Sequence, residues 1–324
     1  MSSPVTSALD TLLDKSVVLG YTSLGPRLRR RWWAADPDVD ALAGHRVVVT
    51  GASGGLGEAT AVGLARLGAS VHLVGRTAER LAAAADRIRD AVPGTRVVED
   101  VCDVSDLDAV AAYAERLRSE HTRLDALVHC AGVLPPQREE SAQGHESTLA
   151  THVLGPLLLT RLLRPLLAAS DDPRVVVVSS GGMYTAPLDA TIADDLEYRR
   201  GEYDGVRAYA RTKRLQVILA EELAAELADD SIAVNSMHPG WADTPGVTDA
   251  LPRFASLLGP VLRTPEDGAD TIVWLVGAAG GGRRSGLFWC DRRPRPTAFV
   301  PGRGEDADAR RRAWDQVEAA LAGD

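Results

Sequence analysis

The chain has 324 residues, 45% of them apolar, and a formal net charge of −9 at pH 7. It is long enough for one large hydrophobic core, and its negative charge argues against broad binding of nucleic acids. Its three cysteines show no metal-ligand spacing and it has no run of about 18 apolar residues, so we expect a cytoplasmic protein with reduced thiols.

Residues 1–43 form an N-terminal extension ahead of the first predicted strand. Charged residues interrupt its apolar positions, which is not the pattern of a secretory signal. A basic stretch at residues 27–33 ends in two tryptophans. Such a stretch can wrap around the domain, cover a pocket or make peripheral contact with a membrane interface. We favour wrapping, because aromatic and basic tracts more often pack than insert.

A glycine-rich turn follows the first predicted strand, residues 45–50, and precedes a helical segment at residues 58–66. In this setting Gly51 permits a tight turn, Gly55 lets a pyrophosphate approach, and Gly57 lets the helix pack closely on the strand. The helix N-terminus offers free N–H groups and its positive dipole end to a phosphate. The alternative is a flexible loop without a ligand. The predicted cofactor-binding residues of this turn are Gly51, Ser53, Gly54, Gly55, Leu56 and Gly57.

The second predicted strand, residues 70–75, leads directly into Arg76. No acidic side chain stands within reach of an adenosine ribose, where a carboxylate would bind the 2′-hydroxyl of NAD. The planar fork of Arg76 can instead hold the 2′-phosphate of NADP. We therefore expect NADP (NADPH) rather than NAD. The alternative is a solvated arginine at the start of a helix.

Further strands are predicted near residues 96–101, 124–130, 174–180, 232–236 and 286–290, with long helices near residues 144–169 and 205–228. This alternation is typical of an α/β fold with a parallel sheet flanked by helices. We expect one domain at residues 44–292 and a C-terminal tail at residues 293–324 that ends in a helix. The leucine-rich stripe of the first long helix is expected to belong to the core first and to a homodimer face second.

Only two of the 36 cationic residues are lysines, and one of them, Lys213, stands four residues after Tyr209. Residues i and i+4 share one face of a helix, so a phenol and an ammonium lie side by side. Arginine would supply the charge but not the compact donor that a small polar pocket requires. The pair suits a tyrosine that acts as acid and base near neutral pH, although a surface lysine behind a half-buried tyrosine would show the same spacing.

Six motifs in chain order resemble those of the short-chain dehydrogenase/reductase family. They are its cofactor loop at residues 50–57, its adenine-side aspartate at 102–104, its Asn-Asn-Ala-Gly segment at 127–132, its serine-bearing strand end at 178–180, its tyrosine–lysine helix at 209–213 and its nicotinamide loop at 239–244. The resemblance covers residues 40–295 and is strongest to the group of dehydrogenase/reductase SDR family member 12. It implies a Rossmann-type, doubly wound parallel sheet in three α/β/α layers and an NAD(P)-dependent enzyme that acts on CH–OH or C=O groups.

The resemblance also assigns roles to single residues. Hydride would pass between nicotinamide and a carbinol carbon, while Tyr209 exchanges the hydroxyl proton and Ser180 holds the substrate oxygen. Lys213 would contact the nicotinamide ribose and, together with oxidised nicotinamide, lower the pKa of Tyr209. The further cofactor-binding residues that the resemblance implies are Asp103, Val104, Cys130, Ala131, Gly132, Tyr209, Lys213, Pro239, Gly240 and Thr244.

Two residues depart from the family's pattern. Cys130 stands where the family usually has an asparagine, which replaces an amide by a weak thiol donor. His152 stands where the family usually has the helix asparagine that orients a proton-relay water. Because an imidazole both donates and accepts, His152 is a candidate catalytic residue, as the relay or as an additional acid/base. A packed histidine without a role in proton transfer is the alternative.

Residues 181–208 form a longer insertion than is usual between the family's serine and tyrosine. Together with Leu134, Pro135, Trp241 and residues 247–258, they are expected to line a mostly apolar pocket over the reacting centre. The expected partner is therefore a small lipophilic ketone, aldehyde or alcohol. An ordered surface loop without substrate contact is the alternative.

Three functions share these features. An NADP-dependent carbonyl reductase or alcohol dehydrogenase is favoured, because the set of Ser180, Tyr209 and Lys213 is complete. A cofactor-binding sensor or scaffold that has lost turnover would fit the changes at Cys130 and His152. Sugar-nucleotide epimerases share the tyrosine–lysine spacing, but we expect a large C-terminal substrate domain in them, which this sequence does not contain.

Overall fold

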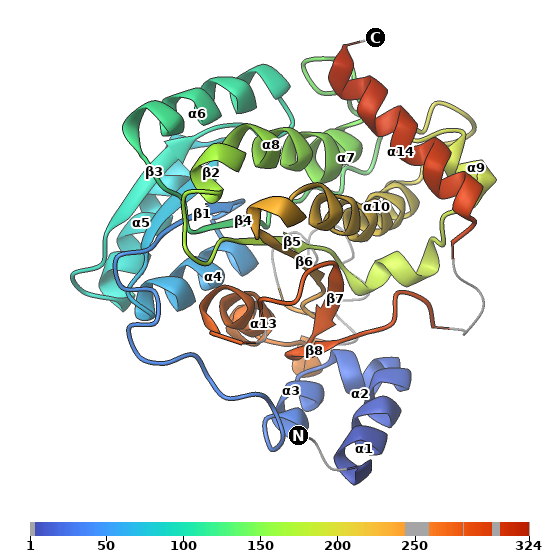
Figure 1. The fold of residues 1–324 in the computed structure, drawn as a ribbon. Helices are drawn as coiled ribbons and strands as arrows, with labels where there is room; N and C mark the ends of the chain where they lie inside the picture. Colours follow the sequence, from blue (N-terminus) through green and yellow to red (C-terminus); the bar gives the residue numbers. More distant parts are fainter. Residues whose placement is uncertain (1–3, 244–258, 281, 300–304, 324) are drawn as a thin grey trace.

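The computed structural model describes residues 4–243, 259–280, 282–299 and 305–323. Its centre is one eight-stranded sheet with the strand order β3-β2-β1-β4-β5-β6-β7-β8 (Figure 1). The strands are β1 Arg46–Thr50, β2 Ser70–Gly75, β3 Val97–Val101, β4 Ala126–His129, β5 Arg174–Val178, β6 Ala233–Met237, β7 Leu287–Cys290 and β8 Arg293–Pro294. Strands β1 to β7 pair in parallel, and β8 pairs antiparallel with β7. The order reverses between β1 and β4, so the predicted Rossmann-type fold class is confirmed.

Helices cover both faces of the sheet, with α4, α5 and α13 on one face and α6, α8 and α10 on the other (Figure 1). The helices of these layers and the short helices beside them are α4 Gly55–Arg66, α5 Ala78–Ala91, α6 Leu107–Glu120, α7 Ser147–Leu149, α8 Gly155–Leu167, α9 Ala190–Ala193, α10 Gly205–Glu226 and α13 Pro265–Gly277. In β1, Val47 and Val49 contact the first layer while Val48 contacts the second. Because the strands are buried on both faces, they are rich in valine.

The strands agree with the prediction to within two residues at either end. The exception is β8, which the sequence pattern does not predict. Its pairing with β7 depends on a turn in which Asp291 and Arg292 have φ of 51° and 56°. Two adjacent residues in the left-handed region form the tight turn that an antiparallel pair requires, and of the two only Asp291 is of a type that often adopts this conformation.

The predicted helix at residues 144–169 is instead broken into α7, a π-helical turn at Ala150–Leu154, and α8. Pro156 has no N–H to donate to the carbonyl of His152, which favours the wider turn. A Cβ at Gly155 would lie 1.9 Å from the carbonyl oxygen of Val104, so the chain passes this segment at very close range. The π-turn contains the candidate residue His152.

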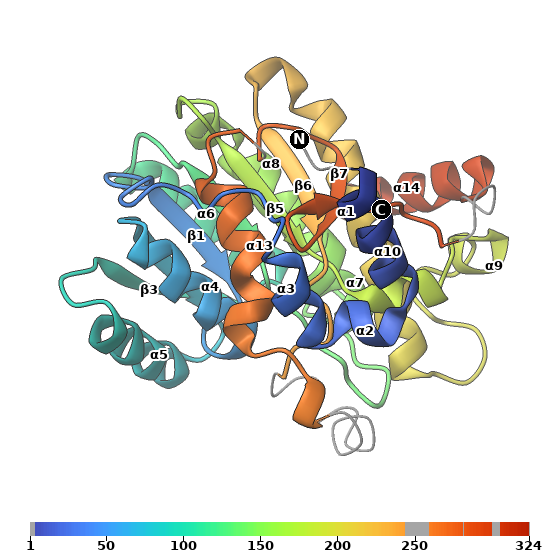
Figure 2. The ribbon, with the colours of Figure 1, turned by 90° about the horizontal axis from the view of Figure 1, so that it is seen from below.

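The N-terminal extension packs against the domain, as the favoured interpretation predicts. Its helices α1 Pro4–Lys15, α2 Val17–Tyr21 and α3 Leu24–Arg29 lie beside β8 and α13 (Figures 1 and 2). Within the basic stretch, Arg29 is fully buried, and the guanidinium of Arg292 stacks 4.7 Å from the ring of Trp33. Through these contacts the basic stretch at residues 27–33 packs against other parts of the same chain.

The predicted C-terminal helix is present as α14 Ala307–Ala322, which lies across α9 and α10 (Figure 1). Ala309, Ala313 and Val317 are buried in the core cluster that includes α8 and α10. Arg161 of α8 binds both Glu226 of α10 and Glu318 of α14. In the leucine-rich stripe of α8 and the turn before it, Leu154, Leu157 and Leu166 are buried, while Leu158 and Leu162 are half-buried. No helix in the described ranges is long and apolar enough to cross a membrane.

Candidate active site

The candidate site lies at the carboxyl ends of β1, β4, β5 and β6, where the strand order reverses. In the glycine turn after β1, Gly51 and Gly55 have φ of 68° and 56°. A Cβ at Gly51 would lie 2.6 Å from the Cα of Ala131, and one at Gly57 would lie 2.3 Å from the carbonyl oxygen of Gly51. The turn therefore needs glycine at these positions both for its conformation and for its close packing.

The remaining loop residues fit a dinucleotide. Ser53, Gly54 and Leu56 are half-buried around the N-terminus of α4, where the first N–H groups of the helix are free to bind a phosphate. The hydroxyl of Thr50 accepts hydrogen bonds from the backbone N–H groups of Cys130 and Ala131, at 3.1 and 3.2 Å. These bonds hold the end of β4 against the glycine turn. The glycine turn, which carries few side chains, leaves space for a pyrophosphate, and the N–H groups at the helix N-terminus can bind it.

Arg76 follows β2 directly and is exposed. Arg80, one turn further along, was not predicted as a site residue, and its Nη2 would lie 3.8 Å from a Cβ at Gly54. Both guanidinium groups are without a hydrogen bond or ion pair to the described residues. Asp103 is half-buried, and its Oδ1 accepts from the N–H and the hydroxyl of Ser105, at 2.9 and 2.7 Å. Val104, beside it, is buried.

The serine and tyrosine of the predicted set lie together. Ser180 follows β5 and caps the 3₁₀ turn Gly181–Thr185, where its Oγ accepts from the N–H of Gly182 at 3.2 Å. Tyr209, in the first turns of α10, lies beside Ser180. Burial raises the pKa of Tyr209 to about 12, and the neighbouring hydroxyl of Ser180 lowers it by less. The protein alone therefore does not produce the lowered tyrosine pKa that the sequence led us to expect.

Lys213 lies one turn along α10, with Nζ 5.3 Å from the centre of the Tyr209 ring. The Nζ donates to the carbonyl of Val178 and to Oε1 of Gln216, both at 2.9 Å. An ammonium has three donors, so one remains for another partner. Burial lowers the pKa of Lys213 to about 8, which keeps it mostly charged near neutral pH. Gln216, which was not predicted, shares the helix face of Tyr209 and Lys213 at spacings of seven and three residues, and this spacing is the sequence signal that would have found it.

The segment after β4 lies close to Lys213 and His152. A Cβ at Gly132 would lie 3.3 Å from Nε2 of His152 and 3.8 Å from Nζ of Lys213, so these residues surround one small space. Burial raises the pKa of the Cys130 thiol to about 12, so the thiol stays protonated. Cys130 therefore adds no charge beside Tyr209.

Both ring nitrogens of His152 have partners. The N–H of Val133 donates to Nε2 at 3.1 Å, so Nε2 carries no proton. Nδ1 is then the protonated nitrogen, and it donates to the hydroxyl of Thr212 at 2.7 Å. Burial, and next the charge of Lys213, lower the pKa of His152 well below its ordinary value. This geometry favours the packed histidine over an acid/base that titrates near neutrality.

The last predicted motif is partly visible. Pro239 and Gly240 follow β6, and Gly240 has a φ of 73°. The N–H of Trp241 donates to the carbonyl of Tyr21 at 2.8 Å, which joins this loop to the N-terminal extension. Thr244 and residues 247–258 lie outside the described residues. Tyr21 had no local sequence signal, because its partners lie more than 200 residues away.

The insertion packs against the segment that follows Gly132. Tyr203 donates to Glu146 at 2.9 Å, and Glu197 binds His145 at 2.8 Å. Arg138 donates to the carbonyl of Glu197 at 3.1 Å. A Cβ at Gly205 would lie 2.2 Å from the carbonyl oxygen of Pro135, so the start of α10 also meets this segment closely. The end of the insertion thus packs against the loop after β4. Contact of the insertion with a substrate stays a prediction.

Comparison with known proteins supports the same assignment. A model of the short chain dehydrogenase family matches residues 45–188. Dehydrogenase/reductase SDR family member 12 from Bos taurus is 37% identical over 290 residues, which cover 89% of this chain and 90% of that protein. Retinol dehydrogenase 14 from Mus musculus is 31% identical over 313 residues, which cover 91% of this chain and 90% of that protein.

Among solved structures, a protein from Escherichia coli CFT073, described as a short chain dehydrogenase complexed with NADPH, has a TM-score of 0.64 and 27% identity and covers 79% of this chain and 100% of its own. Similarity of this extent in both sequence and fold indicates common ancestry. The chain belongs to the short-chain dehydrogenase/reductase family, and it is a nicotinamide-dependent oxidoreductase that acts on CH–OH or C=O groups.

Proposed function

We propose that the protein is an NADP-dependent carbonyl reductase or alcohol dehydrogenase for lipophilic substrates. The observation that carries the proposal is that Ser180 and Tyr209 lie side by side, with Lys213 one helical turn away. The proposal includes a cytoplasmic location.

The residues divide the proton chemistry between them. When bound, the nicotinamide supplies or accepts the hydride. In the reducing direction Tyr209 donates its proton to the carbonyl oxygen, and Ser180 holds that oxygen by a hydrogen bond. The positive charge of Lys213 stabilises the tyrosinate that remains. In the oxidising direction the tyrosinate takes the proton back from the alcohol.

His152 acts in this proposal as a positioning residue. Its bonds to Val133 and Thr212 tie the loop after β4 to α10, the helix that carries Tyr209. The imidazole thereby fixes the distance between the two walls of the site. Replacing it by alanine would leave the N–H of Val133 and the hydroxyl of Thr212 without these partners.

The preference for NADP over NAD rests on Arg76 and Arg80. Both guanidinium groups are exposed beside the glycine turn and unpaired within the described residues, and a 2′-phosphate would give them an anionic partner. The E. coli relative is described as a complex with NADPH. The expected result is at least about tenfold tighter binding of NADPH than of NADH, with Arg76→Ala removing most of the difference. Tighter binding of NADH by the wild-type protein would contradict this preference.

The lipophilic substrate class has two supports. The half-buried side chains of Leu134, Tyr184 and Trp241 belong to the segments that follow β4, β5 and β6, at the edge of the sheet where the site lies. The related mouse enzyme is named for retinol, which is a lipophilic alcohol. Neither support selects one compound.

The test is NADPH oxidation by the purified protein over a panel of lipophilic aldehydes, ketones and quinones. We expect turnover of at least one member by the wild type and a loss of more than about a hundredfold in Tyr209→Phe, with NADPH binding retained. Tyr113→Phe is the matched control, because Tyr113 is buried and bonded to Asp100, away from the site. Binding without turnover in the wild type would instead favour a sensor or scaffold.

A further inference from the structure

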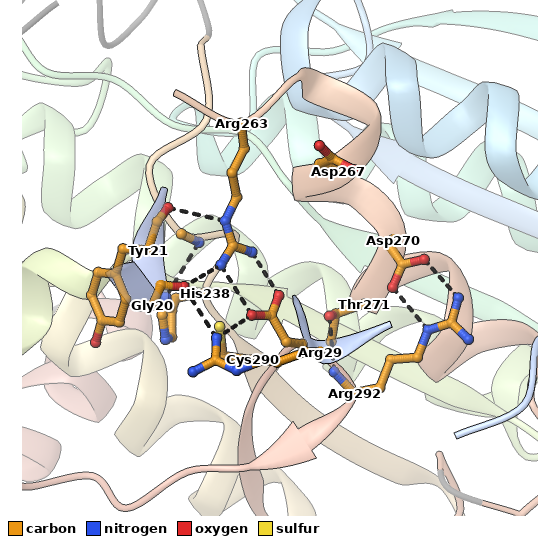
Figure 3. Close-up of polar contacts among 12 residues, drawn as sticks. Gly20, Tyr21, Arg29, His238, Arg263, Asp267, Asp270, Thr271, Cys290 and Arg292 are labelled. Atoms are coloured by element: carbon orange, nitrogen blue, oxygen red, sulfur yellow. Dashed lines mark hydrogen bonds and ion pairs between the residues drawn. The ribbon is translucent and has the colours of Figure 1, made fainter. Parts of the chain in front are cut away.

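The N-terminal helices meet the candidate site through a buried cluster of charged residues (Figure 3). Arg29, Arg263 and Asp291 are each no more than 1% exposed. They come from α3, from the segment before α13 and from the turn between β7 and β8. Three elements that are far apart in sequence therefore share one set of ion pairs.

Arg29 is the contribution of the extension. Its Nε donates to Asp10 at 2.9 Å, its Nη1 donates to the carbonyl of Gly20 at 3.1 Å, and it forms an ion pair with Asp291. Asp10 is held in turn by Arg295 at 2.7 Å. One guanidinium thus fixes α1, the end of α2 and the β7–β8 turn relative to one another.

Arg263 completes the cluster from the other side. It binds both oxygens of Asp291, at 2.6 and 3.0 Å. It also donates to the carbonyl of Tyr21 at 3.0 Å and to that of Gly20 at 2.6 Å. Arg263 therefore holds the end of α2 and the carboxylate that Arg29 pairs with, as Figure 3 shows for its bonds to Gly20 and Tyr21.

The backbone links this cluster to the loop after β6. The N–H of Trp241 donates to the carbonyl of Tyr21, and the N–H of Arg263 donates to the carbonyl of Trp241, both at 2.8 Å. The N–H of Asp243 donates to the carbonyl of Arg263, also at 2.8 Å. A Cβ at Gly240 would lie 2.3 Å from Nε of Arg263. Residues 239–243 are thus held between the extension and Arg263.

The side chain of Tyr21 lies against the segments that follow β5 and β6. Tyr21 is 2% exposed, and its ring centre lies 4.7 Å from that of His238, directly after β6. A Cβ at Gly181 would lie 2.6 Å from Cε2 of Tyr21, so the ring lies on the backbone next to Ser180. One residue of the extension therefore contacts the chain on both sides of the site.

A second set of contacts ties the extension to α13. Arg292 donates to the carbonyl of Ala34 at 3.0 Å and pairs with Asp270 of α13 at 2.6 Å. Arg30 pairs with Asp267, at the start of α13, at 2.6 Å. The extension is thereby held along its length, and the charged cluster is its buried centre.

We propose that residues 4–36 are a positioning element of the nicotinamide site, and that the ion pairs of Arg29, Asp291 and Arg263 hold the loop at residues 238–243 in its binding geometry. Arg29 is the positioning residue, because it alone of these three belongs to the extension. The inference rests on the proposed role of this loop in nicotinamide binding and not on the choice of substrate.

The experiment compares two ligands in two variants. Arg29→Leu removes the ion pairs with Asp10 and Asp291, while Arg174→Leu is the matched control, a buried arginine at the opposite, amino end of β5. The ligands are NADPH and 2′-phospho-ADP-ribose, which lacks only the nicotinamide ring. Dissociation constants are measured at a temperature where circular dichroism shows each variant to be folded.

For Arg29→Leu we expect NADPH to bind at least about tenfold more weakly, with the binding of 2′-phospho-ADP-ribose changed less than about threefold. Arg174→Leu should leave both constants within about threefold of the wild type even where it lowers the melting temperature. If Arg29 had a merely structural role, its replacement would weaken the binding of both ligands equally or of neither. Either of those results in Arg29→Leu would overturn the inference.

If Arg29→Leu does not fold, Arg29→Lys replaces it. The lysine keeps the charge but cannot bridge Asp10, Asp291 and Gly20 at once, so the same difference between the ligands is expected at smaller size. The inference also fails separately from the proposed function. A wild type that binds NADPH but reduces no carbonyl contradicts the substrate proposal alone, whereas unchanged NADPH binding in the Arg29 variant contradicts the positioning role alone.

Discussion

At the scale of single residues, Lys213 is held in a state that destabilises the fold. Its ammonium is buried, and its two acceptors, Val178 and Gln216, do not offset the loss of water, since the pKa falls to about 8. A group retained under such conditions is typical of a functional site. The charge has a use only when an anion such as tyrosinate forms beside it.

The stability of Lys213→Met tests this view. A shift of the lysine pKa from 10.5 to about 8 corresponds to roughly 3 kcal/mol of destabilisation, fully present below pH 8 and lost by the unfolded value of 10.5. We expect the variant to be more stable than the wild type at pH 7 by about 1–2 kcal/mol, after allowing for two lost hydrogen bonds. The difference should shrink as the pH rises above 8. Urea unfolding across this pH range measures it, and a difference independent of pH would contradict the burial of a charged lysine.

Gln216 affects the pKa of Lys213, because it accepts a hydrogen bond from the ammonium. In Gln216→Leu the protonated lysine loses an acceptor at 2.9 Å, so the pKa of Lys213 should fall further. We expect the basic limb of the profile of kcat/KM against pH to move down by about one unit. Gln143→Leu is the control, because Gln143, in the segment between β4 and α7, contacts Asp106 and Asp108 at the start of α6 instead. An unmoved basic limb in Gln216→Leu would show that this contact has no effect on the charge.

At the scale of elements, the turn between β1 and α4 has the tightest requirements. Gly51 combines a φ of 68° with a Cβ position only 2.6 Å from backbone, so any side chain there must displace the loop after β4. That loop also carries Cys130 and Gly132, which lie near Lys213. Strain at the glycine turn should therefore spread to the reacting residues.

Gly51→Ala should lose NADPH binding by more than about tenfold and unfold at lower urea concentration than the wild type. Gly94→Ala is the matched control, since Gly94 has a φ of 83° but nothing within 4 Å of its Cβ position. The control should show only the cost of the left-handed conformation, about 1 kcal/mol, with binding unchanged. Equal loss of binding in both variants would mean that conformation alone, and not the close approach, determines the site.

The insertion at residues 181–208 is held to the rest of the domain by several contacts. Its end is anchored by Tyr203 and Glu197 to the segment before His152, and α9 packs against α14. It is therefore an ordered part of the domain. Sequence length alone suggested a cover over the site, and the contacts with substrate that would make it one are still a prediction.

At the scale of the whole molecule, both ends of the chain complete the domain. The extension closes the β7–β8 edge, and α14 covers an apolar surface of α8 and α10 with Ala309, Ala313 and Val317. The homodimer face that the sequence suggested on the leucine-rich helix stays a prediction.

Removal of residues 305–324 should expose the apolar side of α8 and α10. We expect the melting temperature to fall by more than about 5 °C, because several buried contacts and the pairs of Arg161 and Arg310 are lost. The exposed face should also cause self-association, which sedimentation velocity would detect. A truncated chain that keeps its melting temperature and sedimentation coefficient would show that α14 is only loosely attached.

The parts of the protein that depend on local pattern were predictable from the amino-acid sequence. Short runs rich in valine identified the strands of the parallel sheet, because strands buried on both faces are typically apolar throughout and β-branched side chains favour them. The glycine spacing after β1 and the four-residue step from Tyr209 to Lys213 identified the cofactor turn and the reacting helix, since both motifs act within one or two turns of backbone. The family itself was recognisable from these motifs in order.

The tertiary structure alone decided how distant segments complete the site. The partners of Tyr21 and Arg29 include His238, Arg263 and Asp291, more than 200 residues away, and no periodicity in the sequence can express such a contact. The state of His152 was also decided there, because only the folded chain brings Val133 and Thr212 to its two nitrogens. The spacing of residues determines local geometry, whereas burial and pairing across the sheet exist only once the core has formed.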